Sequence, residues 1–367
     1  MYSPDSRPSR GPLQEFRHIV EHREFPQLPT VKTSLYQPKR VLTNEEMVSW
    51  GLTSGTGKPL TAEGMEDLIG VKQRFIASPE ETPLFMAMKA VEGLHPSGAD
   101  VLLVSSSFPT GQDLAFRIND AYRLGVLPSN RLNIHMACSG FAAGLDWLHR
   151  QGKELEGARV LFVATEKYHP YLANLEDPES RERDPHMAQT IFSDGAAAVS
   201  FTLGEDLSIL TAKSTDAFTR EEDELLQMPV DFTLLKGQVL IKRAPVSPDG
   251  IVHMDGHHVL EKMARVIPDF TRSLVDDAGL NPSDIAAVLF HQGSRKITEW
   301  QAKKLKGEYG LVGRDQEDGN MSSASIPKLM DRLVREGSLH QGNTSVMVGF
   351  GAGLMAAGAV VRFGRAS

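Results

Sequence analysis

The chain has 367 residues, of which 41% are apolar and 23% charged, and its net charge at pH 7 is −8. This length suits two packed halves better than one hydrophobic core. The acidic balance argues against non-specific nucleic-acid binding as the main activity. No apolar run is long enough to span a bilayer, and residues 1–25 lack the apolar core of a signal peptide. We therefore expect a cytoplasmic protein that does not bind membranes.

The first half alternates strands and helices after a polar, Pro-containing segment at 1–28, which we interpret as a tail or surface arm. Buried-type strands without polar alternation are interleaved with segments of helical apolar spacing. In chain order we expect a strand at 30–36, a helix start near 44, a loop at 51–64, a helix at 83–94, a strand at 100–107, a helix at 114–124, strands at 131–137 and 159–165 on either side of a helix at 140–152, and a turn and strand at 192–203.

The second half repeats this scheme. In chain order we expect a helix at 260–278, a strand at 285–291, helices at 298–306 and 326–336, a strand at 344–350, and a glycine turn and strand at 351–363. The order predicts an α/β fold made of two similar halves, at 29–205 and 206–367. In such folds the carboxyl ends of the strands are where the chemistry is placed.

Cys138 is the only cysteine, so an intrachain disulfide and a multi-cysteine metal cage are both excluded. A lone cysteine is most often a small buried apolar residue. Here it lies between the strand at 131–137 and the helix at 140–152, where the positive end of a helix dipole favours a thiolate. Gly140 allows a tight strand-to-helix turn. The setting is that of a nucleophile on a sharp turn.

Two further candidates are His291, directly after an apolar strand, and Asn320, after Asp-Gly. Each taken alone is more typical of a structural histidine and of a turn residue. Together with Cys138 and the glycine-rich stretch at 349–353 they form an ordered set.

Five stretches of this set match one family. They are ACSGF at 137–141, FSDGAAA at 192–198, HQGSRKI at 291–297, GNMSSASIP at 319–327 and GFGAGLMAAGAVVRF at 349–363. From about residue 30 to its end the chain resembles the β-ketoacyl-acyl-carrier-protein synthases III of the thiolase superfamily. The resemblance implies two duplicated βαβαβαββ halves, packed as a five-layered αβαβα core, and a homodimer.

The resemblance also implies a Cys-His-Asn triad of Cys138, His291 and Asn320. The cysteine holds an acyl group as a thioester, and the other two bind the carbonyl of an incoming malonyl-type or β-ketoacyl thioester and stabilise its enolate. The backbone N–H groups of Cys138 and Ala352 would form the oxyanion hole. No cofactor and no metal are implied. Phe108 and Phe350 are expected at the substrate pocket, although ordinary core positions explain both equally well.

The region that binds coenzyme A in this family is altered here. Its tryptophan and first arginine are absent from MEDLIGVKQRF at 65–75, whereas Arg74 is kept. The family's Asn and Arg in the histidine motif are Ser294 and Lys296, and a lysine cannot make the planar bidentate contact of an arginine. We expect Arg74 and Lys296 at a carrier or coenzyme A site.

Lys303 and Lys304 match the position of a docking patch for an acidic acyl carrier protein, with a solvated helix face as the equal alternative. The missing coenzyme A-binding residues favour an acyl donor carried by an acyl carrier protein. They therefore favour a specialised ketosynthase of polyketide or other secondary metabolism. Some enzymes that this chain resembles join two acyl chains. The alternatives are a housekeeping synthase that initiates fatty-acid synthesis, acyl transfer to an oxygen or nitrogen nucleophile, and an inactive acyl-binding scaffold.

Overall fold

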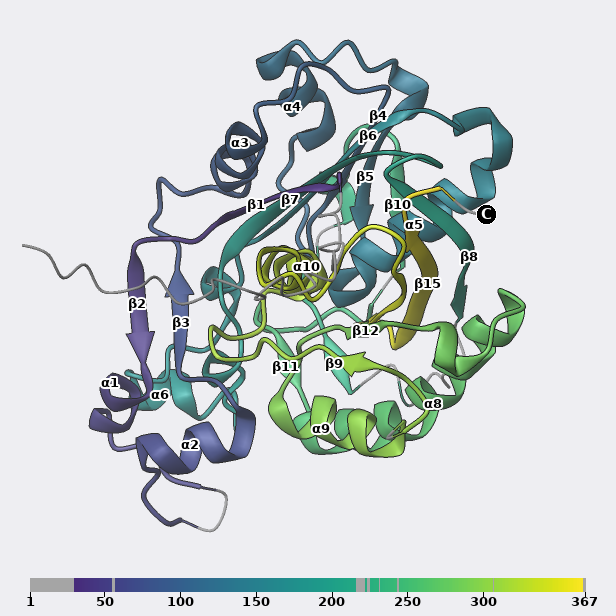
Figure 1. The fold of residues 1–367 in the computed structure, drawn as a ribbon. Helices are drawn as coiled ribbons and strands as arrows, with labels where there is room; N and C mark the ends of the chain where they lie inside the picture. The colour runs from purple at the N-terminus through teal and green to yellow at the C-terminus, as the bar shows by residue number, and fades with distance from the viewer. Residues whose placement is uncertain are drawn as a thin grey trace, which may run out of the picture.

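The computed structural model describes residues 30–54, 57–215, 222, 225–230, 232–242, 244–305 and 307–365, and the predicted arm at 1–28 lies outside this part. The described chain folds into two mixed sheets with helices between and around them (Figure 1). This is an α/β fold, as the sequence predicts. None of the described helices combines the length and apolarity that a membrane span requires.

The first sheet has the order β1-β7-β6-β4-β5-β10. Its strands β4, β5 and β6 are parallel, and β7 runs antiparallel to both β6 and β1. Their bounds are β1 (Lys32–Tyr36), β4 (Val101–Ser105), β5 (Arg131–His135), β6 (Arg159–Glu166), β7 (Gly195–Thr202) and β10 (Val239–Ile241).

The second sheet has the order β13-β12-β14-β15-β8. Its strands are β8 (Leu207–Thr215), β12 (Ala287–Phe290), β13 (Leu311–Val312), β14 (Thr344–Gly351) and β15 (Met355–Phe363). If the strands of each half are counted along the chain, leaving β10 aside, both sheets have the order first, fifth, fourth, second, third. The repeated order confirms the predicted duplication.

Strand β10 is an addition to this scheme. It follows β8 in the chain, yet it pairs in parallel with the outer edge of β5 in the first sheet, with Ile241 opposite His135. The predicted division of the chain near residue 205 is therefore crossed by this strand, and that division stays a prediction.

Helices form three layers around the two sheets. α5 (Gly140–Gln151) and α10 (Ser325–Arg335) pack between the sheets, in a core that contains residues of both. α3 (Pro83–Leu94) and α4 (Leu114–Tyr122) cover the outer face of the first sheet. α8 (Gly256–Asp277) covers the second sheet, with α9 (Arg295–Lys304) against it. Smaller elements are α1 (Asn44–Ser49), α2 (Ala62–Ile69), α6 (Pro178–Arg181), the β2 (Arg40–Thr43) and β3 (Gln73–Ile76) pair, and the β9 (Leu226–Gln227) and β11 (His253–Met254) pair.

Local capping explains where the structure departs from the expected bounds. The helix expected at 260–278 begins four residues earlier, because the Asp255 carboxylate accepts the backbone N–H of His258 and so caps α8. The end of the loop expected at 51–64 is already helical, because the Thr61 hydroxyl caps α2 in the same way. These caps lie beyond the regular apolar spacing from which the bounds were predicted.

Candidate active site

Cys138 lies on a sharp turn between β5 and α5. It is the middle residue of a 3-10 turn, Ala137–Ser139, and the preceding Ala137 adopts the left-handed φ of 42°. A side chain at Gly140 would collide with the side chain of Ser105. The turn therefore requires glycine where α5 begins, and it holds the cysteine against the end of β14.

The end of β14 packs directly on the nucleophile. A β-carbon at Gly351 would lie 2.9 Å from the backbone nitrogen of Cys138, so only glycine allows this approach. Ala352 follows in the turn, and it is not among the residues with a left-handed φ, so alanine fits there without strain. The two proposed backbone donors of the oxyanion hole, at Cys138 and Ala352, therefore belong to segments that lie side by side.

The Cys138 thiol is 5% exposed. Burial raises its pKa to about 12; hydrogen bonds from Ser322 and Asn320 act in the opposite direction, and the Glu166 charge adds to the rise. The thiol is therefore neutral in the free protein. This burial opposes the thiolate that the helix N-terminus is predicted to favour.

His291 follows β12, and its backbone N–H donates to Val348 O at 2.8 Å. The ring meets Phe350 edge-on, at 5.1 Å between centroids. Burial lowers the pKa of His291 to about 3, so the imidazole is neutral. A hydrogen bond with the Ser322 backbone acts in the opposite direction but does not outweigh burial.

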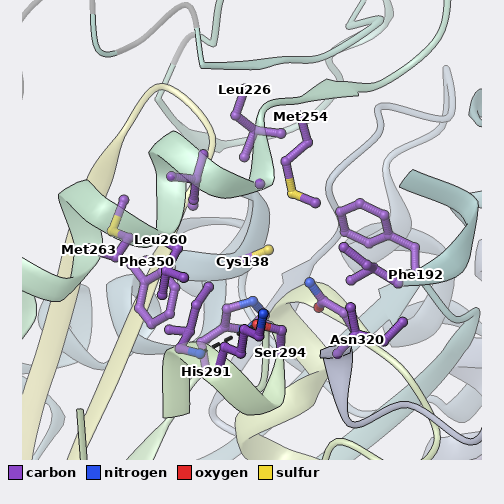
Figure 2. A pocket seen from close by; sticks show the side chains of 18 of the residues that line it. Cys138, Phe192, Leu226, Met254, Leu260, Met263, His291, Ser294, Asn320 and Phe350 are labelled. Carbon is purple, nitrogen blue, oxygen red and sulfur yellow. Dashed lines mark hydrogen bonds between the residues drawn. The ribbon is translucent and has the colours of Figure 1, made fainter. Parts of the chain in front are cut away.

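Asn320 is held by both halves of the protein. Its backbone N–H donates to Ile191 O at 2.8 Å, and its carbonyl accepts the Ser193 N–H at 3.0 Å. Its side-chain oxygen accepts the Ser322 N–H at 2.7 Å. The amide nitrogen is left facing Cys138 (Figure 2). Asn320 can therefore donate hydrogen bonds toward the cysteine side of the site.

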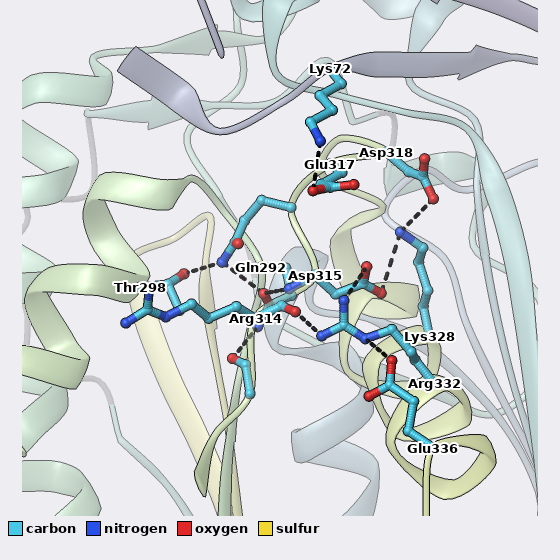
Figure 3. Close-up of polar contacts among 12 residues, drawn as sticks. Lys72, Gln292, Thr298, Arg314, Asp315, Glu317, Asp318, Lys328, Arg332 and Glu336 are labelled. Atoms are coloured by element: carbon cyan, nitrogen blue, oxygen red, sulfur yellow. Dashed lines mark hydrogen bonds and ion pairs between the residues drawn. The ribbon is translucent and has the colours of Figure 1, made fainter. Parts of the chain in front are cut away.

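A buried polar network supports the loop that leads to Asn320 (Figure 3). The Lys328 ammonium, on α10, lies 3.0 Å from Asp318 and 3.4 Å from Asp315. The Gln292 side-chain oxygen accepts the Asp315 N–H at 2.7 Å. Because Gln292 is the neighbour of His291, this network ties the histidine loop to the asparagine loop.

The three side chains meet on one cavity of about 280 Å³. Cys138, His291 and Asn320 all line it (Figure 2). Its other walls are mainly apolar and come from α2, α8, α9, the strands β9, β11 and β14, and the segment at 191–192. Among them are Ile69, Ile191, Phe192, Leu226, Met254, Val259, Leu260, Met263, Ile297 and Phe350. Such a space accepts an apolar chain that ends in a reactive carbonyl.

The two predicted pocket phenylalanines differ. Phe350 lines the cavity beside His291. Phe108 does not line it, contrary to the prediction: it is 4% exposed, stacks on Tyr171 at 4.1 Å and meets Tyr168 edge-on. Its aromatic neighbours cover it, so it is a core residue.

The prediction for Arg74 is also wrong. Its side chain is fully buried, donates to the Thr190 carbonyl at 2.8 Å and bonds the Asn44 side chain. Burial lowers the pKa of Arg74 to about 9. A guanidinium enclosed in this way joins the β3 strand to the 188–190 turn and does not reach a substrate phosphate.

The lysines of α9 are exposed, as a docking role requires. Lys296 lies in the first turn and lines the cavity, next to Ser294, whose hydroxyl caps the helix. Lys303 and Lys304 lie in the last turn, and the Lys304 ammonium lies 4.8 Å from the centre of the Trp300 ring. Their roles stay predictions.

The sequence reasoning missed four buried polar residues behind the cysteine: Ser107, Glu166, Tyr168 and Ser322. Ser107 and Glu166 follow or end apolar strands, and Ser322 directly follows Asn320-Met. Polar residues at the ends of buried strands were the signal that could have found them.

Comparison with known proteins is consistent with this geometry. Residues 275–363 match the family "3-Oxoacyl-[acyl-carrier-protein (ACP)] synthase III C terminal". The chain is 27% identical over 337 residues to β-ketoacyl-[acyl-carrier-protein] synthase III 2 of Streptomyces avermitilis, covering 89% of this chain and 96% of that protein. It is 29% identical to the synthase III of Streptomyces lividans, covering 88% of this chain and 91% of the relative.

Two solved structures agree with these relatives. The synthase III of Aquifex aeolicus has a TM-score of 0.70 and 26% identity, covering 92% of this chain and 99% of that one. The priming β-ketosynthase of the R1128 polyketide biosynthetic pathway has the same TM-score and identity, covering 93% and 98%. The chain is therefore a β-ketoacyl-acyl-carrier-protein synthase III-like acyltransferase of the thiolase fold, a condensing enzyme of the Claisen type.

Proposed function

We propose that Cys138 takes an acyl chain from a thioester and that His291 and Asn320 then prepare the second substrate for carbon–carbon bond formation. The observation that carries this proposal is the meeting of the three side chains on one apolar cavity. A nucleophile at the base of an apolar space can hold a chain, and two neighbouring donors can bind a carbonyl.

In the loading step, the Cys138 sulfur attacks the thioester carbon, and negative charge develops on its oxygen. The backbone N–H groups of Cys138 and Ala352 are proposed to donate to that oxygen. The close contact between Gly351 and Cys138 supports the pairing, because it places the two segments side by side. Fixed donors in a dry site stabilise such charge without reorganisation.

In the condensation step, His291 and Asn320 are proposed to donate to the carbonyl oxygen of a malonyl-type or β-ketoacyl thioester. A malonyl-type substrate loses CO₂, and a β-ketoacyl substrate loses a proton, to give the enolate. The enolate carbon then attacks the Cys138 thioester, and the cysteine sulfur leaves. Since burial holds the pKa of His291 at about 3, the imidazole acts as a neutral donor.

The mouth of the cavity favours an acyl carrier protein over coenzyme A as the donor. Leu68 lines the cavity and is 48% exposed, and it belongs to the segment at 65–75 from which the family's coenzyme A-binding tryptophan is absent. Lys296 is the lysine of the lining and supplies a single ammonium for a phosphate, while Arg74 is buried elsewhere. A pantetheine arm carries one phosphate, whereas coenzyme A brings further phosphates and an adenine. Lys303 and Lys304 would meet the acidic carrier.

We further propose a role in polyketide or other secondary metabolism, including the joining of two acyl chains. The altered mouth supports this role over the alternative of a housekeeping enzyme that initiates fatty-acid synthesis. Acyl transfer to oxygen or nitrogen is the other alternative, and the His291 and Asn320 pair argues against it, because such transfer needs no enolate. A homodimer is also proposed.

Intact-protein mass spectrometry tests the proposal. Wild type and Cys138→Ala are each mixed with a panel of acyl thioesters on carrier protein and on coenzyme A. Wild type is expected to gain one acyl mass, preferentially from the carrier, and to lose it when malonyl or β-ketoacyl carrier is added. Absence of any adduct that depends on Cys138 would overturn the proposal; an ester or amide product would favour acyl transfer.

A further inference from the structure

Behind Cys138, on the side away from the cavity, a chain of buried hydroxyl groups ends at a carboxylate. The Ser322 Oγ lies 3.4 Å from the Cys138 Sγ and 2.9 Å from the Ser107 Oγ. The Ser107 side chain in turn interacts with the Glu166 carboxyl and helps to lower its pKa. Ser107, Ser322 and Glu166 are all buried. Exchangeable protons on Ser322 and Ser107 therefore lie between the sulfur and Glu166.

Glu166 is anchored firmly at the end of this line. It accepts the Ser107 N–H at 2.9 Å and the Ser323 N–H at 3.2 Å, and the Ser323 hydroxyl bonds it as well. Burial raises the pKa of Glu166 to about 7, and the hydrogen bonds from Ser323 and Ser107 oppose that rise. Near neutral pH the carboxyl is therefore able to gain and to lose a proton.

The phenol of Tyr168 lies beside the two serine hydroxyls. It donates to the Ser107 Oγ at 2.9 Å, with the Ser322 Oγ at 3.1 Å. Its ring stacks on Phe192, which lines the cavity. In the structure the Ser322 hydroxyl donates to the Cys138 Sγ. Rotation of this hydroxyl toward Ser107, 2.9 Å away, frees its oxygen to accept the thiol proton, while the Ser107 proton points to Glu166. The titratable groups that feel the Glu166 charge are Cys138 and Tyr168, and the phenol stays neutral because burial raises its pKa well above the usual value.

We propose that Ser322 and Ser107 relay the thiol proton of Cys138 to Glu166 during acyl loading, and that Glu166 returns it when the sulfur leaves in condensation. This inference rests on the proposed function, and it concerns how the thiol is activated. Ser322 touches the reacting atom and is a catalytic residue. Ser107 and Tyr168 are positioning residues, and Glu166 is a proton store that acts through them.

The proton and electron balance of both steps closes. In loading, the sulfur–carbon bond forms as the thiol proton passes to Ser322, the Ser322 proton to Ser107 and the Ser107 proton to Glu166. The departing thiolate takes a proton from water. In condensation, the new carbon–carbon bond releases the Cys138 thiolate, which receives the stored proton along the same path. Because the free thiol has a pKa far above that of Glu166, transfer occurs only as the sulfur bonds to carbon.

The only cysteine in the chain makes a direct test available. Alkylation by iodoacetamide, followed by intact mass from pH 5 to 10, reports on Cys138 alone and needs no acyl substrate. Wild type is expected to show a rise in rate with a midpoint near pH 7. Glu166→Gln is expected to lose that rise and to react about 100-fold more slowly at pH 8, within the range for general base catalysis.

Matched variants separate the relay from a structural role. Ser322→Ala and Ser107→Ala are expected to lose the rise, whereas Ser106→Ala keeps it, because the Ser106 hydroxyl donates to the Phe108 carbonyl outside the chain. Ser323→Ala is expected to move the midpoint to higher pH, because its bond to Glu166 lowers the carboxyl pKa. Thermal melting identifies any variant that does not fold.

Persistence of the rise in Glu166→Gln, or in folded Ser322→Ala if the Gln variant does not fold, would overturn the relay. So would an equal loss of the rise in Ser106→Ala. The proposed function fails separately: no thioester would then acylate Cys138, although the alkylation profile keeps its rise. Acylation together with an unchanged profile in Glu166→Gln would leave the function standing and remove the relay.

Discussion

The side-chain oxygen of Asn320 accepts the backbone N–H of Ser322 at 2.7 Å and the Ser325 hydroxyl at 3.5 Å, and these bonds fix which end of the amide faces the cavity. Only the nitrogen end is left to meet a substrate, so Asn320 is a donor. The first of these bonds joins the enolate side of the site to Ser322, which contacts the Cys138 sulfur. The two halves of the proposed reaction therefore share one short stretch of chain.

The first prediction separates the two steps at Asn320. Asn320→Ala is expected to acylate Cys138 at a rate within about threefold of wild type and to condense about 10²- to 10³-fold more slowly, as when one oxyanion donor is removed. Asn320→Asp keeps the acceptor for Ser322 but loses the donors, and it should condense no better. Single-turnover mass spectrometry follows both steps. If loading collapses as much as condensation, the assignment of Asn320 is wrong.

The second prediction concerns the charge state of His291. Because its pKa is about 3 in the folded protein and near 6.5 when unfolded, the unfolded chain binds more protons between these values. Stability should therefore fall as the pH drops below about 6.5, by up to about 1.4 kcal/mol per pH unit from this group. Urea unfolding at pH 7, 6 and 5 measures the slope.

His291→Gln is the matched variant for this test, since glutamine does not titrate. Its slope below pH 6.5 should be smaller than that of wild type. Glutamine also keeps an N–H donor, so it is expected to retain more condensation than His291→Ala. Equal slopes in wild type and His291→Gln would contradict the neutral, buried imidazole.

The third prediction tests the close approach of β14. Gly351→Ala adds a methyl group 2.9 Å from both the Cβ and the backbone nitrogen of Cys138. Overpacking of this kind costs about 1–3 kcal/mol, and loading should slow because the nucleophile must move. Gly256→Ala is the control, because its nearest neighbour is the Met254 methyl at 3.9 Å. Urea unfolding and iodoacetamide alkylation compare the pair; equal effects would contradict the tight contact.

The fourth prediction addresses the buried ion cluster. Lys328→Met leaves Asp315 and Asp318 without their shared cation and should cost about 3–5 kcal/mol. Lys89→Met, on α3, removes an exposed pair with Glu92 and should cost much less. Chemical denaturation at pH 7 measures both, and similar losses would contradict the cluster's role.

This cluster also predicts a pH dependence. Burial raises the pKa of Asp318, but the Lys328 charge and the hydrogen bonds from Gln73 and Gln37 outweigh it, so the net pKa is below the usual value. A lowered carboxyl pKa stabilises the fold above about pH 4, and that contribution is lost as the pH falls further. The difference between wild type and Lys328→Met should therefore narrow below pH 4.

The fifth prediction tests the docking face of α9. The double change Lys303→Glu and Lys304→Glu should raise the KM for carrier-bound acyl groups while leaving the rate with short acyl-pantetheine substrates unchanged. Lys153→Glu, an exposed lysine just beyond the far end of α5, is the control. Steady-state kinetics at low salt make the comparison, since surface charge effects are screened by salt. An unchanged KM would remove this face from the proposal.

The sequence predicted the elements that carry Cys138, His291 and Asn320, because strands buried on both faces and amphipathic helices leave clear apolar patterns. The helix at Pro83–Leu94 was predicted with its exact bounds, since Thr82 and Pro83 mark its start. The resemblance of five motifs to one family implied which three residues meet. The sequence did not predict how deeply these side chains are buried or which residues surround them.

Arg74 and Cys138 illustrate that limit. From the sequence, an arginine in a substrate-binding segment is interpreted as a phosphate ligand. The contacts of Arg74 with Thr190 and Asn44 show that its role is structural. A cysteine at a helix start reads as a thiolate, whereas its enclosure makes it a neutral thiol. In both cases the deciding contacts come from segments distant in sequence, which periodicity does not report.

Strand β10 has a consequence for how copies of this protein can meet. It closes the outer edge of β5, and its last pair, Ile241 with His135, lies three residues before Cys138. A second molecule that extends the first sheet at this edge must first displace that short strand. Assembly at this edge would therefore disturb the backbone that holds the Cys138 sulfur in place. Hydrogen–deuterium exchange of the β10 backbone amides would measure how readily this strand opens.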